Sequence, residues 1–224
     1  MLLTIPRVLD AGQLARVREL LSSARFVDGR LSAGQHARRV KHNEEIPMDA
    51  RELEELNRLV MGSLVQRPEY QNGALPHRVA VPFYARYTEG MGYGTHIDDP
   101  VMGPAQGRYR TDVSLTVFLN EPEEYDGGEL VIQAVYGEQK MKLAAGDAVM
   151  YPSGSLHRVE KVTRGERLVA VTWIQSLVPD PARRELLYGL NQAREALMKH
   201  QPDAEETARV DRAYINLVRM WTQI

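Results

Sequence analysis

The amino-acid sequence predicts an α+β protein in which helical segments flank a core of β-strands arranged as a sandwich or jelly roll. Apolar residues recur at helical spacing in residues 1–77 and again in residues 179–224. Residues 78–178 instead contain short runs of strand-forming residues separated by turn signals. A chain of 224 residues is long enough for one sizeable core with flanking extensions.

Two helices are expected in the N-terminal segment. Asp10, followed three residues later by Gln13, is typical of a capping box at the start of a helix. The apolar residues that follow at helical spacing are Leu14, Val17 and Leu21. A second helix is expected to begin at Asp49, with acidic residues in its first turn, where the helix dipole favours them. Its buried face is expected to consist of Leu53, Leu56 and Val60.

The polar stretch between these helices, Asp28–Pro47, is expected to form a loop. It contains a cluster of basic residues, namely Arg30, Arg38, Arg39 and Lys41. We interpret this cluster as part of a solvated loop, with a phosphate site as the alternative interpretation.

The central segment is rich in Val, Thr, Tyr, Phe and Leu, the residues that favour strands. Several short strands at this spacing favour a sandwich or jelly roll over alternating strand and helix units. The expected strands are Arg78–Tyr87, Asp112–Asn120, Gly128–Val135, Gln139–Leu143, Asp147–Tyr151 and Arg167–Gln175.

The pattern becomes helical again after Pro179 and Pro181. The spacing of Leu186, Leu187, Leu190 and Leu197 suits one helix, and that of Val210, Tyr214, Leu217 and Trp221 suits a second. Acidic and basic residues balance over this segment, so we interpret it as an appendage that packs on the core. A surface for a homo-oligomer is the alternative interpretation.

The composition excludes several classes of site and partner. Cysteine is absent, so any metal site must use His, Asp and Glu. The net charge is −2 and no long basic block is present, so a nucleic-acid partner is not expected. There is no apolar run of about 18 residues that would predict a membrane span. The first residues do not resemble a signal peptide, and a cytoplasmic location is therefore expected.

The most informative stretch lies around residues 95–99. If these residues are extended, His96 and Asp98 project from the same face of a strand, because side chains alternate with a period of two. His157 lies where a later strand would bring a third metal ligand back to them. Asp99 would point to the opposite face of the sheet, which makes it a poor candidate for a ligand.

Two imidazoles and one carboxylate occupy one face of an octahedron and leave three positions open, which suits non-haem Fe(II). A structural zinc site would instead be closed by four protein ligands. Arg167, at the start of a predicted strand ten residues after His157, adds a guanidinium that can bind a carboxylate through two hydrogen bonds. A surface ion pair on an edge strand is the alternative interpretation for Arg167.

Together these residues make the sequence resemble the Fe(II)- and 2-oxoglutarate-dependent dioxygenases of the prolyl 4-hydroxylase type. Within them it is most similar to the bacterial PKHD-type hydroxylases, also called iron-uptake-factor-like hydroxylases, and the resemblance runs nearly end to end. Besides the residues above, it is carried by Phe26–Arg30, Arg86–Tyr87, Tyr93–His96, Glu124–Leu130, Leu156–Val159, Thr163–Arg167 and Trp173–Ser176. The resemblance implies that residues 78–178 form a double-stranded β-helix, a distorted jelly roll with iron near one mouth.

The resemblance also implies roles for individual residues. His96, Asp98 and His157 would bind Fe(II), and Arg167 would bind the C5 carboxylate of 2-oxoglutarate. The prolyl 4-hydroxylases of animals have Lys at the position of Arg167, and either side chain can bind a carboxylate.

Tyr87 and Tyr93 lie where related enzymes place tyrosines of the pocket, with a position in the core or at the rim as the alternative. The implied reaction uses O₂ to hydroxylate a C–H bond while 2-oxoglutarate is decarboxylated to succinate and CO₂. L-Ascorbate as a reductant for iron, and a link to iron acquisition, are implied by the resemblance alone.

Other interpretations stay open. A cupin-like metal-binding or iron-sensing module would use the same ligands without oxygenase activity, and a structural jelly roll would hold no metal. The primary substrate, a small molecule or a protein residue, is not predicted. Four further histidines are expected at the surface, namely His36, His42, His77 and His200. The lining of a substrate mouth and the solvation of strand edges are the two interpretations of Tyr109, Arg110, Asp112 and Ser114.

Overall fold

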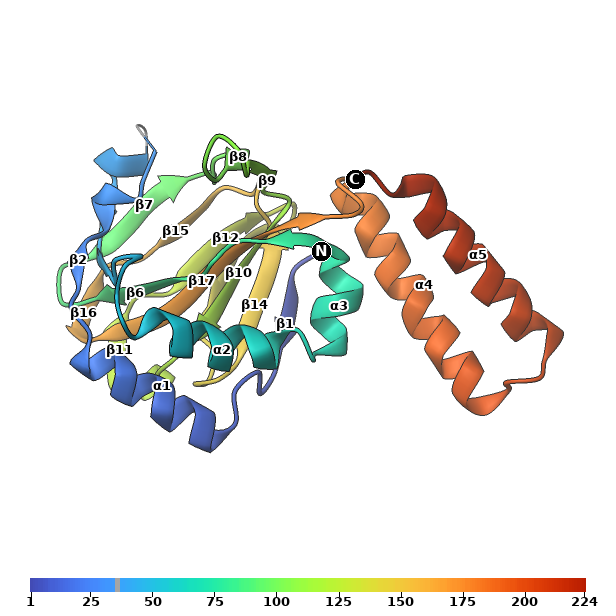
Figure 1. The fold of residues 1–224 in the computed structure, drawn as a ribbon, viewed down its shortest axis with the longest axis horizontal. Helices are drawn as coiled ribbons and strands as arrows, with labels where there is room; N and C mark the ends of the chain where they lie inside the picture. Colours follow the sequence, from blue (N-terminus) through green and yellow to red (C-terminus); the bar gives the residue numbers. More distant parts are fainter. Residues whose placement is uncertain (35–36) are drawn as a thin grey trace.

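The computed structural model describes residues 1–34 and 37–224. Two antiparallel β-sheets face each other, helices cover the outer side of the larger sheet, and a helical hairpin extends from one end (Figure 1). This mixture of helices and strands confirms the predicted α+β class.

The larger sheet has eight strands within the described residues, in the order β1-β14-β10-β17-β6-β4-β2, with β5 paired to β17. These strands are β1 (Leu3–Ile5), β2 (Val27–Asp28), β4 (Glu44–Glu45), β5 (Pro76–Val79), β6 (Phe83–Tyr87), β10 (Val113–Phe118), β14 (Ala148–Pro152) and β17 (Arg167–Ser176).

The smaller sheet has the order β13-β12-β15-β7-β3. Its strands are β3 (Lys41–His42), β7 (Gly92–His96), β12 (Leu130–Ala134), β13 (Gly137–Met141) and β15 (His157–Val159). Two further antiparallel pairs join β8 (Val101–Met102) to β9 (Tyr109–Arg110) and β11 (Tyr125–Gly127) to β16 (Val162–Gly165).

The strands in the middle of the larger sheet are buried on both faces, as strand β10 shows. Leu115 and Val117 belong to the apolar cluster that includes the helices on the outer face. Their neighbour Phe118 belongs to a second cluster, which lies between the two sheets. Thr116 lines a cavity between the sheets. Alternation along the strand thus separates a structural face from a face that is available for a site.

Helices α1 (Ala11–Ser23), α2 (Leu53–Leu64) and α3 (Pro68–Ala74) precede β5. The predicted capping box of α1 is confirmed, because the Gln13 N–H donates to the Asp10 carboxylate at 2.8 Å and the Asp10 N–H donates to the Gln13 amide oxygen at 3.0 Å. The predicted apolar faces of the first two helices are largely buried against the larger sheet. The described residues also contain three short 3-10 helices, namely Gly29–Leu31, Ala37–Arg39 and Pro122–Glu124.

The N-terminal segment differs from the prediction in four ways. The stretch Asp28–Pro47, expected as a loop, contributes β4 to the larger sheet and β3 to the smaller one. These strands have two residues each, and their partners β6 and β7 lie far along the chain, so the local sequence carries little signal for them. Helix α2 begins at Leu53 rather than Asp49, and α3 was not predicted. Lys41, expected in a solvated cluster, is 9 % exposed because its β3 position faces the space between the sheets.

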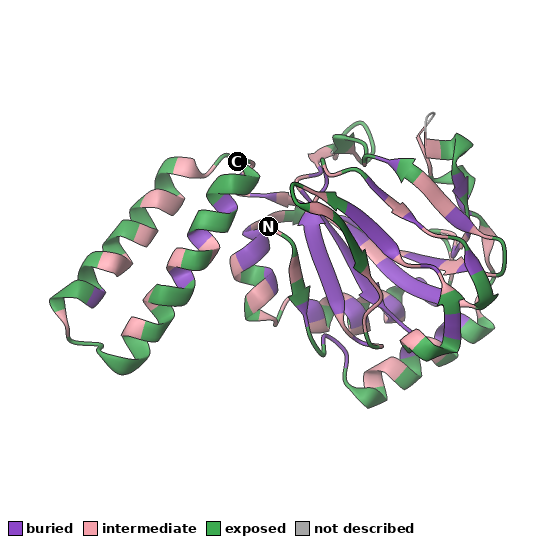
Figure 2. Ribbon diagram, turned by 180° about the vertical axis from the view of Figure 1, so that it is seen from behind, coloured by how far each residue is buried: buried purple, intermediate pink, exposed green. Residues whose placement is uncertain are grey.

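The C-terminal segment forms the two expected helices, α4 (Pro181–His200) and α5 (Glu205–Trp221). They form a hairpin that extends away from the sheets and is largely exposed (Figure 2). Leu187, Tyr214 and Trp221 pack in a small cluster where the hairpin meets the core. Leu187 is buried, whereas its neighbour Leu186 is 65 % exposed, because adjacent helical residues point in different directions.

None of the helices in the described part of the chain is both long and apolar enough to span a membrane. The division of the chain at residues 77/78 and 178/179 stays a prediction, and α1 and α2 share one apolar cluster with the larger sheet.

Candidate active site

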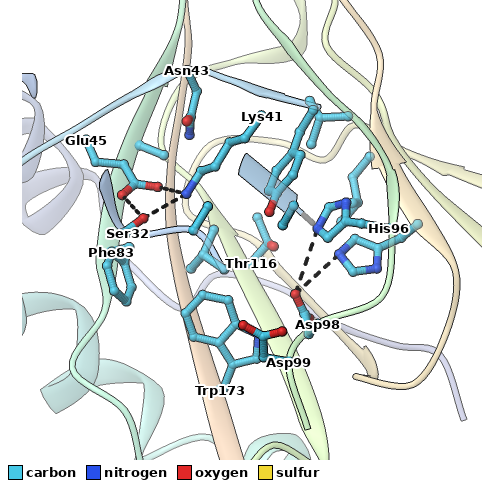
Figure 3. Close-up of a pocket in the computed structure, with 18 of the residues that line it drawn as sticks. Ser32, Lys41, Asn43, Glu45, Phe83, His96, Asp98, Asp99, Thr116 and Trp173 are labelled. Carbon is cyan, nitrogen blue, oxygen red and sulfur yellow. Dashed lines mark hydrogen bonds and ion pairs between the residues drawn. The ribbon is translucent and has the colours of Figure 1, made fainter. Parts of the chain in front are cut away.

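The three predicted metal ligands lie together at one end of the smaller sheet. His96 ends β7 and His157 begins β15, and the two residues are opposite each other in the antiparallel register. Oδ1 of Asp98 lies 3.9 Å from Nε2 of His96 and 3.7 Å from Nε2 of His157. One donor atom from each residue falls within 4.8 Å of the others, which is close enough for one metal ion (Figure 3).

Both imidazoles are oriented by backbone carbonyls. Nδ1 of His96 lies 2.8 Å from the Gly94 carbonyl oxygen, and Nδ1 of His157 lies 3.0 Å from the Ser155 carbonyl oxygen. An Nδ1–H that donates to a carbonyl leaves the lone pair on Nε2, the nitrogen that faces Asp98. Both rings are therefore set in the tautomer that a metal requires.

The Asp98 carboxylate is held from the larger sheet. Ser114 on β10 donates its hydroxyl to Oδ2, and Ser153 lies 2.7 Å from the Ser114 oxygen and can donate to it. Oδ1 is left facing the two imidazoles. Sequence reasoning proposed Ser114 for a substrate mouth or a solvated strand edge, whereas it is 1 % exposed and orients Asp98.

Strand β7 ends at His96, so the expected alternation over residues 95–99 does not extend to Asp98 and Asp99. Asp98, which lies just beyond the strand, still faces His96. The prediction that Asp99 points to the opposite face of the sheet is wrong. Asp99 lines the same cavity as the triad. It lies outside the three-residue donor group.

His96 is further fixed by stacking. The ring of Tyr93 lies parallel to the His96 ring, with centroids 3.7 Å apart and planes 15° apart. Burial, together with the nearby ring of His157, lowers the pKa of His96 to about 4. The imidazole is therefore neutral at neutral pH, the form that binds metals. Tyr93 lines the cavity, as predicted, and burial raises its pKa.

Arg167 lies between the sheets, at the start of β17, and is 1 % exposed. The prediction of a non-surface role is supported by its surroundings, because Nε and Nη1 are buried and have no hydrogen-bond partner among the described residues. Its guanidinium carbon lies 5.0 Å from the ring centroid of Tyr87 and 5.6 Å from that of Phe118. A buried guanidinium without a carboxylate needs an anion, because desolvating an unpaired charge is costly.

Two tyrosines border this arginine. Tyr87 is opposite Arg167 in the β6–β17 register, and burial raises its pKa to about 12. The hydroxyl of Tyr125 is also buried without a partner among the described residues, and burial raises the pKa of Tyr125. Both phenols are neutral donors beside the guanidinium. Tyr125 was not predicted as a site residue, although it lies in one of the segments that carry the family resemblance.

One cavity of about 110 Å³ joins the triad to Arg167. One side of the cavity is formed by the paired strands β6 and β17 of the larger sheet, whose alternate side chains face inward. These side chains are Phe83, Ala85 and Tyr87 of β6 and Arg167, Val171 and Trp173 of β17. The side facing them carries the triad, and most of the remaining lining is apolar or aromatic. Such a site keeps water away from reactive groups while a few polar side chains orient the ligand.

A third group of cavity residues was missed by the sequence analysis. Ser32, Lys41, Asn43 and Glu45 close the cavity from the N-terminal segment. Lys41 and Glu45 form an ion pair in which both side chains are less than 10 % exposed. In the sequence, a lysine and a glutamate four residues apart in a polar stretch are typical of a surface ion pair. Only the strands that pair with β3 and β4 show that this ion pair is buried.

The other predicted positions lie outside the cavity. Arg110 binds Asp112 at 2.7 Å, and Asp112 in turn accepts from the Ser176 N–H, so these residues stabilise the strand ends. His42 and His200 are exposed and His77 is half-buried, while His36 lies outside the described residues.

Comparison with known proteins identifies the family. The pattern of the 2OG-Fe(II) oxygenase superfamily matches residues 82–175. A PKHD-type hydroxylase of Thioalkalivibrio sulfidiphilus is 57 % identical over 100 % of both chains, and one of Pseudomonas putida is 43 % identical over 100 % of both. The chain belongs to the PKHD-type hydroxylases. It is therefore an enzyme, a 2-oxoglutarate- and Fe(II)-dependent oxygenase, as the sequence predicted.

Solved structures show the same fold at low identity. A prolyl hydroxylase from Trichoplax adhaerens, solved with a peptide of hypoxia inducible factor, has a TM-score of 0.59 at 19 % identity and covers 83 % of this chain and 86 % of its own. A prolyl-4-hydroxylase of Pseudomonas putida has a TM-score of 0.53 at 21 % identity, covering 78 % of this chain and 92 % of its own. At such identities the likeness concerns the fold alone.

Proposed function

We propose that His96, Asp98 and His157 bind the Fe(II) of this PKHD-type hydroxylase and that Arg167 binds the C5 carboxylate of 2-oxoglutarate. The observation that carries the proposal is the buried Arg167 guanidinium, which lacks an anionic partner among the described residues and shares one cavity with the triad. The co-substrate supplies the missing anion at one end and a keto acid that can chelate iron at the other.

The donor set fits Fe(II). Two imidazoles and one carboxylate converge from one side, and their second polar atoms are hydrogen-bonded to Gly94, Ser155 and Ser114. Such a facial arrangement leaves coordination positions open for a co-substrate and O₂. With Fe(II) bound, the site would supply oxidative decarboxylation of 2-oxoglutarate to succinate and CO₂, coupled to hydroxylation of the primary substrate.

The side chains of the cavity would bind and orient the 2-oxoglutarate. Arg167, with Tyr87 and Tyr125 beside it, would fix the far end of the keto acid. Val171 and Leu130 line the cavity with apolar surface that excludes water. The paired sheets support a double-stranded β-helix as the description of the core. L-Ascorbate as a reductant for iron and a role in iron acquisition are part of the proposal on the basis of family resemblance.

The test is an anaerobic titration of the metal-free protein with Fe(II) and then 2-oxoglutarate, followed by the visible charge-transfer band of a chelated keto acid. We expect a band in the wild type and its loss in Asp98→Ala. Asp126→Ala is the matched control, because it removes an exposed carboxylate that pairs with Arg164. Retention of the band in Asp98→Ala would refute the triad.

A second variant separates the two ligand roles. Arg167→Ala removes the anion partner but no metal donor, so 2-oxoglutarate binding is expected to weaken by about 100-fold, or about 2.7 kcal/mol, while Fe(II) still binds. Tight iron binding without any band in the wild type would favour the alternative, a cupin-like metal-binding or iron-sensing module. Failure to bind iron would refute both.

A further inference from the structure

The cavity has an outer end that the co-substrate does not need. Along β17, Arg167 marks the inner end and Trp173 the outer end of the same inward face. Trp173 lies opposite Ser114 in the β10–β17 register, and Ser114 holds the Asp98 carboxylate. The indole is therefore beside the triad, on the side away from Arg167, where the primary substrate would approach.

Two aromatic rings form a corner at this outer end. The rings of Phe83 and Trp173 lie 5.6 Å apart and meet at 76°. Both are half-buried and line the cavity. In the part of the chain that the structure describes, the cations near aromatic rings of this cavity lie over Tyr93 and Tyr87, not over this pair. The corner is thus available to a cation from outside the chain.

A carboxylate stands at the same end. Asp99 is exposed and lines the same cavity as Trp173. Its carbonyl accepts from the Thr111 hydroxyl, and the next residue, Asp112, donates its N–H to Ile174 at 3.0 Å. These bonds tie the backbone of Asp99 to the end of β17. No side chain of the described residues forms an ion pair with Asp99.

The charges that line the cavity point to a cationic ligand. Lys41 and Glu45 neutralise each other. Arg167 is matched by the C5 carboxylate of 2-oxoglutarate, and Asp98 together with the C1 carboxylate is matched by Fe(II), as proposed above. Among the described residues that line the cavity, Asp99 is then the charged side chain that none of these pairings neutralises. A negative charge beside two perpendicular aromatic faces is complementary to an ammonium or guanidinium group.

We infer that the primary substrate carries a cationic nitrogen, and that Phe83, Trp173 and Asp99 bind it beside the metal. This inference rests on the proposed function, because it assigns to 2-oxoglutarate the space next to Arg167. It identifies the substrate class as a protonated amine or guanidinium, free or on a side chain of a larger molecule. Phe83, Trp173 and Asp99 are specificity-determining residues.

The test uses three probes of equal length and different charge, namely butylammonium, butanol and butyrate. Each is added anaerobically, at constant ionic strength, to protein saturated with Fe(II) and 2-oxoglutarate. Binding is followed by the fluorescence of Trp173 in a Trp221→Phe background, because the chain has two tryptophans and Trp221 lies in the C-terminal hairpin. We expect butylammonium to bind at least tenfold more tightly than butanol, and butyrate to bind most weakly.

Two variants localise the preference. In Asp99→Asn the advantage of butylammonium over butanol is expected to fall below threefold, and in Phe83→Leu it is expected to fall as well, while the charge-transfer band persists in both. Equal binding of the cation and the alcohol by wild-type protein, or an unchanged preference in Asp99→Asn, would overturn the inference. The band is recorded before any probe is added, so a protein without the band refutes the proposed function, whereas a band without cation preference refutes the inference alone.

Discussion

Lys41 and Glu45 form a buried ion pair that joins the two sheets at the edge of the cavity. Lys41 lies on β3 of the smaller sheet and Glu45 on β4 of the larger one, and Nζ of Lys41 lies 2.5 Å from Oε1 of Glu45. Ser32 donates to the other carboxylate oxygen. The Lys41 ammonium also lies 5.5 Å from the ring centroid of Tyr93, which stacks on His96. The pair therefore connects sheet packing to the orientation of a proposed metal ligand.

Removal of one partner of this pair should destabilise the protein strongly. Lys41→Met leaves the Glu45 carboxylate buried without its cation, and we expect a loss of about 3–5 kcal/mol of unfolding free energy in urea denaturation. The double variant Lys41→Met/Glu45→Gln should recover a large part of that loss, because no unpaired charge remains. A single variant as stable as the wild type would show that water reaches the pair.

The Ser114 hydroxyl should affect iron affinity without being a ligand. In Ser114→Ala the Asp98 carboxylate loses the donor to Oδ2 and gains freedom to rotate. Loss of such an outer hydrogen bond typically weakens metal binding about 10- to 100-fold. Competition with a chelator measures this. Ser153→Ala, which removes the group behind Ser114, should have a smaller effect, and the reverse order of the two variants would contradict the proposed chain of hydrogen bonds.

Gly128 should control the position of Arg167. It has φ of +69°, and a Cβ at this residue would lie 3.0 Å from Cε2 of Tyr125 and 3.1 Å from Cδ of Arg167. Gly128→Ala should therefore weaken 2-oxoglutarate binding roughly tenfold, because the guanidinium shifts, and leave iron binding intact.

The matched control for Gly128→Ala is Gly90→Ala. Gly90 has φ of +83° and nothing within 4 Å of the added Cβ, so both variants incur a similar backbone cost of about 1 kcal/mol. Isothermal titration with 2-oxoglutarate should distinguish them. Equal affinities in the two variants would show that Arg167 tolerates the added methyl group.

Tyr70 on α3 should determine part of the alkaline stability. Its hydroxyl is buried without a partner among the described residues, and burial raises its pKa to about 12. Above the ordinary tyrosine pKa of about 10, the unfolded chain loses this proton while the folded chain retains it, so stability falls as the pH rises from 10 towards 12.

Tyr70→Phe removes both the unpaired hydroxyl and the ionisable group. We expect a gain of about 1 kcal/mol at pH 7 and a smaller loss of stability between pH 10 and 12, measured by denaturation at a series of pH values. Tyr136→Phe, at a position 96 % exposed, is the control and should change neither quantity. A destabilised Tyr70→Phe variant would indicate that the hydroxyl has a partner in solution.

The sequence by itself predicted the strand-rich core, the flanking helices and the proposed site residues, because each has a local signal. Capping residues start α1, runs of strand-forming residues mark β10 and β17, and His96-x-Asp98 with His157 and Arg167 carries the family resemblance. The alternation used to join His96 to Asp98 was applied beyond the end of its strand. The alternation placed Asp98 correctly beside His96, but it placed Asp99 on the wrong face because neither residue belongs to the strand.

Only the tertiary structure decided how residues 28–47 contribute to the cavity. Strands β3 and β4 have two residues each, too few for a periodic signal, and they form because distant strands offer free edges. Burial of Lys41, the missing partner of Arg167 and the right-angled contact of Phe83 with Trp173 likewise arise between segments far apart in the chain. A local pattern specifies which face of an element is apolar, whereas desolvation and charge pairing depend on which elements come to face each other.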